Sequence, residues 1–456
     1  MVDPYRQKVH LEPDKGFLND PNGLVHFKGS FYVFHQWNRM ACDRSYKEWG
    51  LFTSKDLAFW ERRGTAIVPD TLFDKDGVYS GSAFVENDCL HIFYTGNSRD
   101  DLGKRTPYQC HCVSKDAKTF LKMTNPLLPP NGYSEHFRDP MVFKRSGAWW
   151  MIVGAQDCAD NGNIAVFRSS DLNKWDFKGN MLEQPLDNMC ECPGLQRIGD
   201  VDVLIASPQR KEVRDGELKV VSRRSCYCIG KFNDLEARFQ PSSPMIPLDL
   251  GPDYYAPQMM RVEDGRVLML AWMSGMTQED EKACPTVHNG YIHCLTFPRE
   301  LTLENGRLYQ KPVDEISLLR CSEEIELSEG TYSHIPDACE LIWNCTSPET
   351  DKSIEIGGLC SMHFKSGAEE LVVERLAVEG NKRWSKTLSL KSVTSLRMIW
   401  DISSIELFLN DGSIVLSMRA YSTLERKLRA TGINSNDSCI CYKLKSIYGS
   451  GASYEE

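Results

Sequence analysis

The chain has 456 residues, about three times the usual length of one domain, so it must form two domains or one large repetitive domain. Apolar residues make up 41% and aromatic residues 10%, which excludes a disordered chain. The 53 basic and 63 acidic residues give a formal charge of −10, and we see no runs of Lys or Arg. We therefore expect neither nucleic acid nor a membrane surface as the main partner.

The sequence shows no sign of membrane insertion or export. Its longest apolar runs, 149–153 and 267–273, are far shorter than the ~20 residues that span a bilayer. The first residues lack the basic and apolar segments of a signal peptide, so we expect a cytoplasmic protein, or a secreted one if an upstream signal was removed. The 17 cysteines are an odd number without zinc-site spacing, which predicts free, mostly buried thiols in a reducing compartment.

A short pattern that ends in an aromatic residue recurs at Ser54–Trp60, Ser114–Phe120 and 169–175, and more weakly at 232–239. Its aspartates are separated by 60, 55 and 63 residues: Asp56, Asp116, Asp171 and Asp234. Short apolar or alternating runs around these patterns predict strands at 30–36, 90–95, 148–155, 163–168, 201–206 and 266–273. Several short strands in a repeat of about sixty residues are typical of a β-propeller blade, so about 300 residues predict five blades.

A second series of polar, turn-like motifs runs out of phase with the first. Its markers are spaced by 62, 57, 52 and 62 residues: Asp20, Ser82, Asp139, Glu191 and Asp253. A single Asp-Pro motif is ordinarily just a turn, but recurrence at one phase of a propeller repeat predicts that all five markers face the central axis. Carboxylates that share a pocket have separated pKa values, so one can donate a proton while another attacks, as in retaining glycoside hydrolysis.

The ordered motifs resemble glycoside hydrolase family 32, the invertase and sucrose-6-phosphate hydrolase group of β-fructofuranosidases. The likeness covers nearly the whole chain and rests on these segments: 19–23 (NDPNG), 31–36 (FYVFHQ), 49–50 (WG), 80–83 (SGSA), 138–140 (RDP), 191–193 (ECP), 253–258 (DYYAPQ), 295–301 (LTFPREL) and 310–313 (QKPV). The resemblance implies an all-β fold, a five-bladed β-propeller followed by a C-terminal β-sandwich. It also implies that no metal or organic cofactor is needed.

The same resemblance implies residue roles. Asp20 is expected to be the nucleophile, Glu191 the general acid/base and Asp139 the transition-state stabiliser that holds fructose hydroxyls. The residues expected to bind substrate are Asn19, Gln36, Trp49, Ser82, Arg138, Asp253 and Tyr255. The chain departs from the family pattern at Phe17-Leu18, where Trp-Met is usual, and at Leu51, where bacterial members commonly have His.

We expect a catalytic propeller over residues 1–310, a linker over 311–321 and a β-sandwich over 322–456. Pro312 and a short helix-like stretch at 313–320 indicate the linker. Strand patterns then return at 340–343, 370–378, 395–402 and 405–409, and the last of these turns through Asn410-Asp411-Gly412 into 413–418. We expect this domain to pack against the propeller, with a lectin-like role as the lesser alternative.

The predicted function is hydrolysis of terminal β-D-fructofuranosides through a covalent fructosyl-enzyme, with sucrose, sucrose 6-phosphate or both as substrate. The alternatives are a fructosyltransferase or a fructan exo-hydrolase on the same scaffold, and a sugar-binding propeller without catalysis. Since all three acids are present, the non-catalytic alternative is the weakest. A homo-oligomer is compatible with the sequence.

Overall fold

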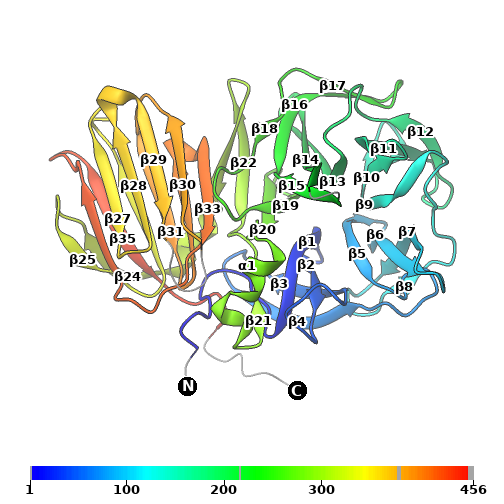
Figure 1. Cartoon of the computed structure of the whole chain (residues 1–456), viewed down its shortest axis with the longest axis horizontal. Coiled ribbons are helices and arrows are strands. Elements are labelled where there is room, and N and C mark those ends of the chain that lie inside the picture. The colour runs from blue at the N-terminus through cyan, green and yellow to red at the C-terminus, as the bar shows by residue number, and fades with distance from the viewer. Residues whose placement is uncertain (1–2, 215–216, 377–381, 450–456) are drawn as a thin grey trace.

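The computed structural model describes residues 3–214, 217–376 and 382–449. Nearly all regular structure is β, and helical segments are short: α1 (Gln278–Lys282) and the 3₁₀ turns Pro285–Val287, Asp314–Leu319, Ser366–Ala368 and Asn410–Gly412. The strands form seven sheets, in two groups that lie side by side (Figure 1). Within the described residues, no helix is long and apolar enough to cross a lipid bilayer.

The first five sheets follow one another along the chain and consist mainly of antiparallel neighbours. The first comprises β1 (Gly16–Phe27), β2 (Ser30–Asn38), β3 (Glu48–Ser54) and β4 (Trp60–Ile67), with β21 (Tyr291–Ile292) parallel to β1. The second comprises β5 (Val78–Glu86), β6 (Cys89–Arg99), β7 (Arg105–Ser114) and β8 (Leu121–Lys122). The third comprises β9 (Tyr133–Arg145), β10 (Ala148–Asp157), β11 (Gly162–Ser169) and β12 (Asp176–Asn180).

The fourth sheet carries an extra hairpin. Its main path is β13 (Met189–Ile198), β14 (Val201–Arg214), β16 (Cys226–Asn233) and β17 (Arg238–Pro241), whereas β15 (Glu217–Arg223) pairs with the far end of β14, and β18 (Ile246–Pro247) with β16. The fifth sheet comprises β19 (Tyr255–Arg261), β20 (Val267–Trp272), β22 (Arg299–Glu304) and β23 (Arg307–Pro312). The first strands of the five sheets, β1, β5, β9, β13 and β19, contact one another in a closed ring.

Apolar clusters fill the spaces between neighbouring sheets of the ring. Between the first and second sheets, for example, Phe34 and Trp49 pack with Ile92 and Tyr94. Equivalent clusters join the second sheet to the third, the third to the fourth and the fourth to the fifth. Because each sheet is covered on both faces, its middle strand is buried almost throughout, as the pattern of β10 shows.

The repeated Ser-x-Asp pattern forms the same turn three times. Asp56, Asp116 and Asp171 each accept hydrogen bonds from the backbone N–H groups two and three residues further on. The residue after each aspartate has left-handed φ, at 61° for Leu57, for example. The fourth copy differs, because Asn233 accepts the corresponding bonds. Local turn chemistry thus explains the first sequence repeat.

The last two sheets stack face to face. One has the order β24 (Arg320–Glu326), β35 (Ser438–Leu444), β26 (Cys339–Asn344), β31 (Ser395–Trp400), β32 (Ser404–Leu409) and β33 (Ile414–Arg419). The other has the order β25 (Tyr332–His334), β34 (Lys427–Thr431), β27 (Lys352–Ile356), β28 (Cys360–Lys365), β29 (Glu370–Arg375) and β30 (Trp384–Ser389). One apolar cluster includes residues from both sheets, among them Trp343, Met398, Met362 and Phe364. Of the strands predicted for this part of the chain, the one at 370–378 extends past residue 376, and its last residues lie outside the described residues.

Buried polar contacts join the N-terminal segment and the ring to these two sheets. His10 lies between Asp401 and Glu406, with 2.9 Å from Nδ1 to Asp401 Oδ2 and 2.9 Å from Nε2 to Glu406 Oε1. Arg299 of β22 also contacts Glu406 and, at 3.1 Å, Asp249. All of these side chains are buried, so a network of charges lies inside the junction. An apolar cluster accompanies it and brings Leu268 and Phe297 together with Phe408 and Val415 of the C-terminal sheet.

Candidate active site

Each first strand of the ring breaks its pairing register at a similar place. The breaks lie at Asn22/Val25 in β1, Val78/Gly81 in β5, opposite Ile152/Gly154 in β9, Glu191/Gly194 in β13 and Tyr255/Gln258 in β19. In four of these strands a residue at the break has left-handed φ: Gly23 51°, Asp139 67°, Cys192 46° and Ala256 51°. A bulge bends its strand and redirects the neighbouring side chains, so these breaks decide which motif residues face a common pocket.

Three of the predicted carboxylates meet in one pocket of about 250 Å³. Asp20 comes from β1, Asp139 from β9 and Glu191 from β13, so three separate sheets contribute to it. The lining residues are Asn19, Asp20, Gln36, Arg44, Lys47, Tyr79, Arg105, His136, Arg138, Asp139, Glu191, Gln209, Arg223, Tyr255 and Trp272. In the part of the chain that the structure describes, no group of three or more His, Cys, Asp or Glu side chains could hold a metal ion.

Asp20 is held by neutral hydrogen-bond donors. Its Oδ2 accepts from Ser80 Oγ at 2.6 Å and from Gln36 Nε2 at 3.2 Å, and its Oδ1 accepts from Asn19 Nδ2 at 3.2 Å. Lys47 donates to Asn19 Oδ1 at 3.2 Å and so brings a positive charge close to the carboxylate. Burial raises the pKa of Asp20, and the hydrogen bond from Ser80 opposes this shift.

Glu191 is held by a cation and by two neutral donors. Its Oε1 accepts from Arg138 Nε at 3.0 Å and Nη2 at 2.6 Å, while its Oε2 accepts from the Tyr255 hydroxyl at 2.5 Å and from Gln209. Burial alone would raise the pKa of Glu191, but the Arg138 charge and these hydrogen bonds outweigh burial and lower it.

Asp139 is deeply buried and contacts no cation directly among the described residues. Its Oδ2 accepts from the backbone N–H of Cys192 at 3.0 Å, and the Cys192 Sγ lies 3.5 Å away. Burial raises the pKa of Asp139 to about 7; Arg138 opposes this, whereas the nearby Glu191 and Asp20 charges add to it. The three acids therefore sit in three different environments, which is the condition for separate roles as nucleophile, acid/base and hydrogen-bonding partner.

Four of the seven predicted binding residues line the pocket with these acids: Asn19, Gln36, Arg138 and Tyr255. Trp49 does not reach it, because the side chain is fully buried between the first two sheets and donates from Nε1 to the backbone oxygen of Tyr79 at 3.0 Å. Trp49 instead supports the strand that carries Ser80.

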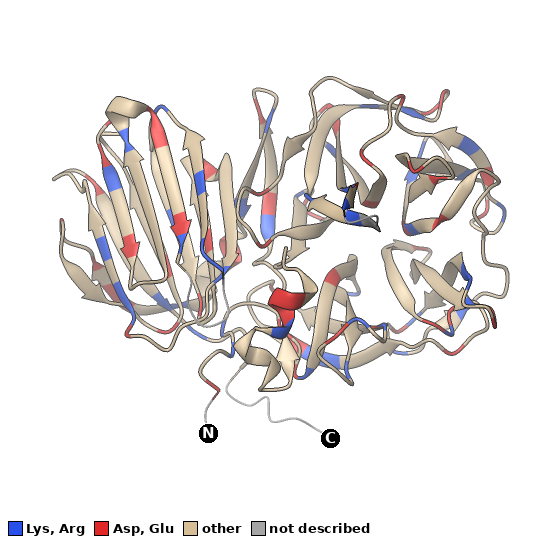
Figure 2. Cartoon of the chain, viewed as in Figure 1, with Lys and Arg blue, Asp and Glu red and all other residues tan. Residues whose placement is uncertain are grey.

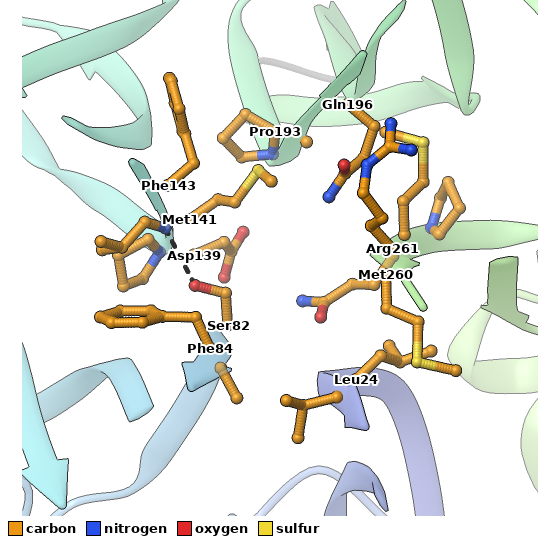
Figure 3. A pocket seen from close by; sticks show the side chains of 18 of the residues that line it. Leu24, Ser82, Phe84, Asp139, Met141, Phe143, Pro193, Gln196, Met260 and Arg261 are labelled. Carbon is orange, nitrogen blue, oxygen red and sulfur yellow. Dashed lines mark hydrogen bonds between the residues drawn. The ribbon is translucent and has the colours of Figure 1, made fainter. Parts of the chain in front are cut away.

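Ser82 lines a different cavity, about 290 Å³ in volume, which adjoins the pocket at Asp139. Figure 3 shows Ser82 and Asp139 on one side of this cavity and Leu24 and Met260 on the other. The Ser82 Oγ accepts a hydrogen bond from the backbone N–H of Val142 at 3.1 Å. The bulge in β5 thus leaves Ser80, not Ser82, beside Asp20.

Asp253 lies at the junction with the C-terminal sheets and does not line the pocket. Its Oδ2 accepts from Arg375 Nη1 at 2.5 Å and from the backbone N–H of Arg419 at 2.8 Å. The expected convergence of four carboxylates and a serine is therefore replaced by three carboxylates with Ser80. From the same motif, Tyr255 reaches the pocket because it lies two residues further along the chain, beside the bulge of β19.

Several lining residues had no sequence signal. Gln209 and Arg223 lie beyond the predicted strand 201–206, and Arg105 and His136 fall outside the repeated motifs. Ser80 stood inside a predicted motif, but only the bulge distinguishes it from Ser82.

Comparisons with known proteins agree with this geometry. The model of the glycosyl hydrolases family 32 N-terminal domain matches residues 10–312, and the model of the family 32 C-terminal region matches residues 360–440. A sucrose-6-phosphate hydrolase of Bacillus subtilis is 36% identical over 431 residues, covering 92% of this chain and 89% of the relative. A raffinose invertase of Escherichia coli is 32% identical, covering 90% of this chain and 88% of the relative.

Solved structures are similar over almost the full length. The sucrose-6-phosphate hydrolase from Lactobacillus gasseri superimposes with a TM-score of 0.88 at 29% identity, covering 98% of this chain and 94% of that one. The GH32 beta-fructofuranosidase of Bombyx mori, determined as a mutant in complex with sucrose, gives a TM-score of 0.84 at 25% identity, covering 98% and 96%. The predicted family resemblance is thereby confirmed.

Proposed function

The chain belongs to glycoside hydrolase family 32, and on this premise we propose that Asp20, Glu191 and Asp139 catalyse retaining hydrolysis of a terminal β-D-fructofuranosyl unit. The protein is an enzyme that cleaves sucrose-type fructosides.

In the proposed mechanism, Asp20 attacks the anomeric C2 of the fructosyl unit while Glu191 donates a proton to the departing glycosidic oxygen. Because Arg138 and Tyr255 lower the pKa of Glu191 in the free enzyme, this step requires the bound substrate to raise that pKa. Glu191, now a carboxylate, then deprotonates the water that hydrolyses the fructosyl-enzyme. This course requires the two carboxyl groups to lie roughly 5–5.5 Å apart. Asp139 holds fructose hydroxyls with bonds that strengthen as the ring approaches an oxocarbenium ion.

One observation carries this proposal: the two reacting acids share a pocket but have separate sets of hydrogen-bond partners. Ser80, Gln36 and Asn19 orient Asp20, whereas Arg138 and Tyr255 orient Glu191. No side chain in one set donates a hydrogen bond to the acid of the other set. The charge of Asp20 can therefore change while Glu191 stays in position, and the charge of Glu191 can change while Asp20 stays in position.

Asn or Gln substitutions test the assignment. We expect Asp20→Asn and Glu191→Gln each to lower turnover by several orders of magnitude, with an unchanged thermal midpoint as the control for folding. Near-normal turnover in either purified variant would overturn the proposal. Retention is tested separately by NMR of the first-formed fructose, which should be the β anomer; early α anomer would exclude the covalent intermediate.

We also propose the finer architecture that the sequence predicted. The five ring sheets are the five blades of a propeller, which ends with β23 at Pro312 and not at the predicted residue 310. The linker is then 313–319, with the 3₁₀ turn Asp314–Leu319, and the β-sandwich begins with β24 at Arg320 and not at the predicted residue 322. The closed ring of first strands supports the blade assignment. All 17 cysteines are free and most are buried, which supports a reducing compartment, the cytoplasm.

The substrate we propose is sucrose phosphorylated on its glucosyl unit, known as sucrose 6-phosphate. The support comes from the relatives' activities and from the cationic lining of the pocket, which suits a phosphorylated sugar better than a neutral one. A fructosyltransferase on the same scaffold would give a product chromatogram dominated by oligosaccharides at moderate sucrose. An exo-hydrolase would prefer inulin in a comparison of kcat/KM.

A further inference from the structure

The pocket is lined by more cationic side chains than carboxylates. Five cations line it, namely Arg44, Lys47, Arg105, Arg138 and Arg223, against the three carboxylates Asp20, Asp139 and Glu191. On the Asp20 side, Arg44 is neutralised by Glu281 at 2.5 Å and Lys47 lies beside Asn19. On the Glu191 side, Arg138 is neutralised by Glu191 itself. Arg105 and Arg223 are left on the Glu191 side.

We propose that Arg105, Arg223 and Lys211 form an anion subsite beside Glu191 that binds the phosphate of the leaving glucosyl unit. The inference rests on the proposed function, since it assumes that Glu191 protonates the leaving oxygen. The group that departs must lie on the Glu191 side of the scissile bond. A phosphate has three acceptor oxygens and up to two negative charges, which arginine side chains match best.

The β14–β15 hairpin carries two of these cations. Gln209 and Arg223 are cross-strand partners in it, so their side chains lie on the same face, and Gln209 reaches Glu191 from that face. Lys211, two residues after Gln209 on β14, shares this face because strand side chains alternate. Figure 2 shows the basic residues of this hairpin in blue near the middle of the ring.

Neither Arg223 nor Lys211 has a salt-bridge partner among the described residues. Burial and the neighbouring charge of Arg138 lower the pKa of Lys211, although Asp160 opposes this shift. The charge of Arg223 reaches Glu191 and favours its carboxylate form. Arg223 lines the pocket, and Lys211 lies outside the lining but close enough for its charge to act on Glu191.

Arg105 completes the wall from the second sheet. Its Nη2 lies 3.0 Å from His136 Nδ1, and Arg138 Nη1 lies 3.2 Å from the same nitrogen. Burial and the two arginines lower the pKa of His136 to about 3, so the ring is neutral at pH 7. Because Nδ1 accepts from both arginines, the ring proton must be on Nε2, which leaves a donor for an anion.

The Arg105 side chain itself is incompletely satisfied. Its Nε is buried without a partner, and its nearest carboxylate is Glu135 at 3.5 Å, which is 45% exposed. Burial and the Arg138 charge lower the pKa of Arg105, as expected for a buried cation that lacks a strong counter-ion. An incoming phosphate would supply that counter-ion.

The double variant Arg105→Gln/Arg223→Gln tests the subsite. We expect wild-type enzyme to prefer sucrose 6-phosphate over sucrose in kcat/KM, and the double variant to lose at least tenfold of that preference. Glucose 6-phosphate should inhibit wild type more strongly than glucose does, and the double variant should show little difference between the two. Arg210→Gln is the matched control, since Arg210 alternates to the opposite face of the hairpin and pairs with Glu212 at 3.0 Å.

The possible outcomes distinguish a failure of the proposed substrate from a failure of the proposed subsite. A wild-type enzyme without preference for the phosphorylated substrate would overturn both the proposed substrate and the subsite, while Asp20→Asn would still test the catalytic roles. A preference that survives in the double variant would overturn the subsite alone. A preference lost equally in Arg210→Gln would show a general effect of surface charge and would also overturn it.

A pH profile gives a second readout that a merely structural role would not produce. A phosphate beside Glu191 adds negative charge, disfavours its carboxylate and so raises its pKa. The alkaline limb of kcat should therefore lie at higher pH with sucrose 6-phosphate than with sucrose, and the difference should vanish in the double variant. Coincident alkaline limbs for the two substrates in wild type would place the phosphate away from Glu191.

Discussion

The buried carboxylates of the pocket differ from those at the junction with the C-terminal sheets in the cations they contact. At the junction each has a direct partner, as Asp253 has Arg375 and Asp401 has His10. In the pocket, neither Asp20 nor Asp139 forms a salt bridge with any described residue. Burial alone therefore does not distinguish the pocket acids from the junction acids. Asp20 and Asp139 differ from the junction acids in lying beside a cavity without a direct cation, whereas Glu191, which Arg138 contacts, differs only in lining the cavity.

The largest expected effect on stability comes from breaking the junction at Asp253→Asn. The variant keeps the shape of the side chain but leaves the Arg375 charge buried without an anion, which should cost about 3–5 kcal/mol in free energy of unfolding. Urea unfolding would measure this loss, and kcat should stay within about tenfold of wild type because Asp253 is outside the pocket. Asp20→Asn is the matched control, with the opposite pattern: turnover lost and stability kept. An Asp253→Asn variant that unfolds normally but is inactive would restore Asp253 to substrate binding.

The next effect is a pH dependence of stability that arises at His10. Burial lowers the pKa of His10, but its hydrogen bonds to Asp401 and Glu406 outweigh burial and raise the pKa to about 9. A raised folded-state pKa means that the stabilisation is complete below about pH 6.5 and is lost as pH rises through 9. At 1.36 kcal/mol per pKa unit, His10 contributes about 3 kcal/mol to this loss.

His10→Gln removes the titrating group and keeps a polar side chain. We expect the variant to be less stable than wild type at pH 6 and the gap to shrink towards pH 10, as measured by urea unfolding at each pH. Burial raises the pKa of Glu12 to about 8, so Glu12 also makes the protein less stable as pH rises. This contribution is the same in wild type and variant, so the difference between their curves of stability against pH reports on His10 alone. A constant gap across this range would show that His10 is neutral in the folded protein.

A smaller effect is expected when one donor to Glu191 is removed by Tyr255→Phe. The Tyr255 hydroxyl stabilises the Glu191 carboxylate at 2.5 Å, so its loss should raise the pKa of Glu191. A hydrogen bond to a charged group is worth about 1.5–3 kcal/mol, which corresponds to a rise of about one to two pH units in the alkaline limb of kcat/KM. An unshifted limb with lowered kcat would mean that Tyr255 acts on the sugar and not on the acid.

The sequence predicted those parts of the fold and site that depend on local chemistry. The Asp56, Asp116 and Asp171 turns repeat because the same side-chain acceptor recurs in the same context, and the strands between them alternate or run apolar as buried strands do. The ordered motifs also predicted the three carboxylates that share one pocket in the structure, Asp20, Asp139 and Glu191. These signals are readable without coordinates because neighbours in the sequence create them.

The sequence did not predict features that depend on bulges or on contacts between distant parts of the chain. A one-residue bulge in β5 exchanged Ser82 for Ser80, and strand alternation cannot reveal a bulge. Asp253 has the right phase in the repeat, but its partner Arg375 lies 122 residues away. The cations Arg105 and Arg223 come from two different sheets and meet only when the ring closes.

The smallest effect should come from Cys192→Ala, which tests whether the pocket acids depend on the thiol between them. The Cys192 Sγ lies 3.5 Å from Asp139 Oδ2 and 4.0 Å from Asp20 Oδ2, but the stronger bond to Asp139 comes from the Cys192 backbone N–H, which alanine retains. We therefore expect turnover to fall by less than about tenfold, since a weak thiol donor contributes little.

Burial and the nearby Asp139 charge raise the pKa of Cys192 well above its usual value, so the side chain stays a thiol at neutral pH. Iodoacetamide should label the exposed Cys158 and leave Cys192 unmodified, as peptide mass spectrometry would show, with no loss of activity. Rapid labelling of Cys192 with parallel inactivation would mean that the thiolate forms in the pocket. The positive charge there would then be neutralising this sulfur as well as any anion bound beside Glu191.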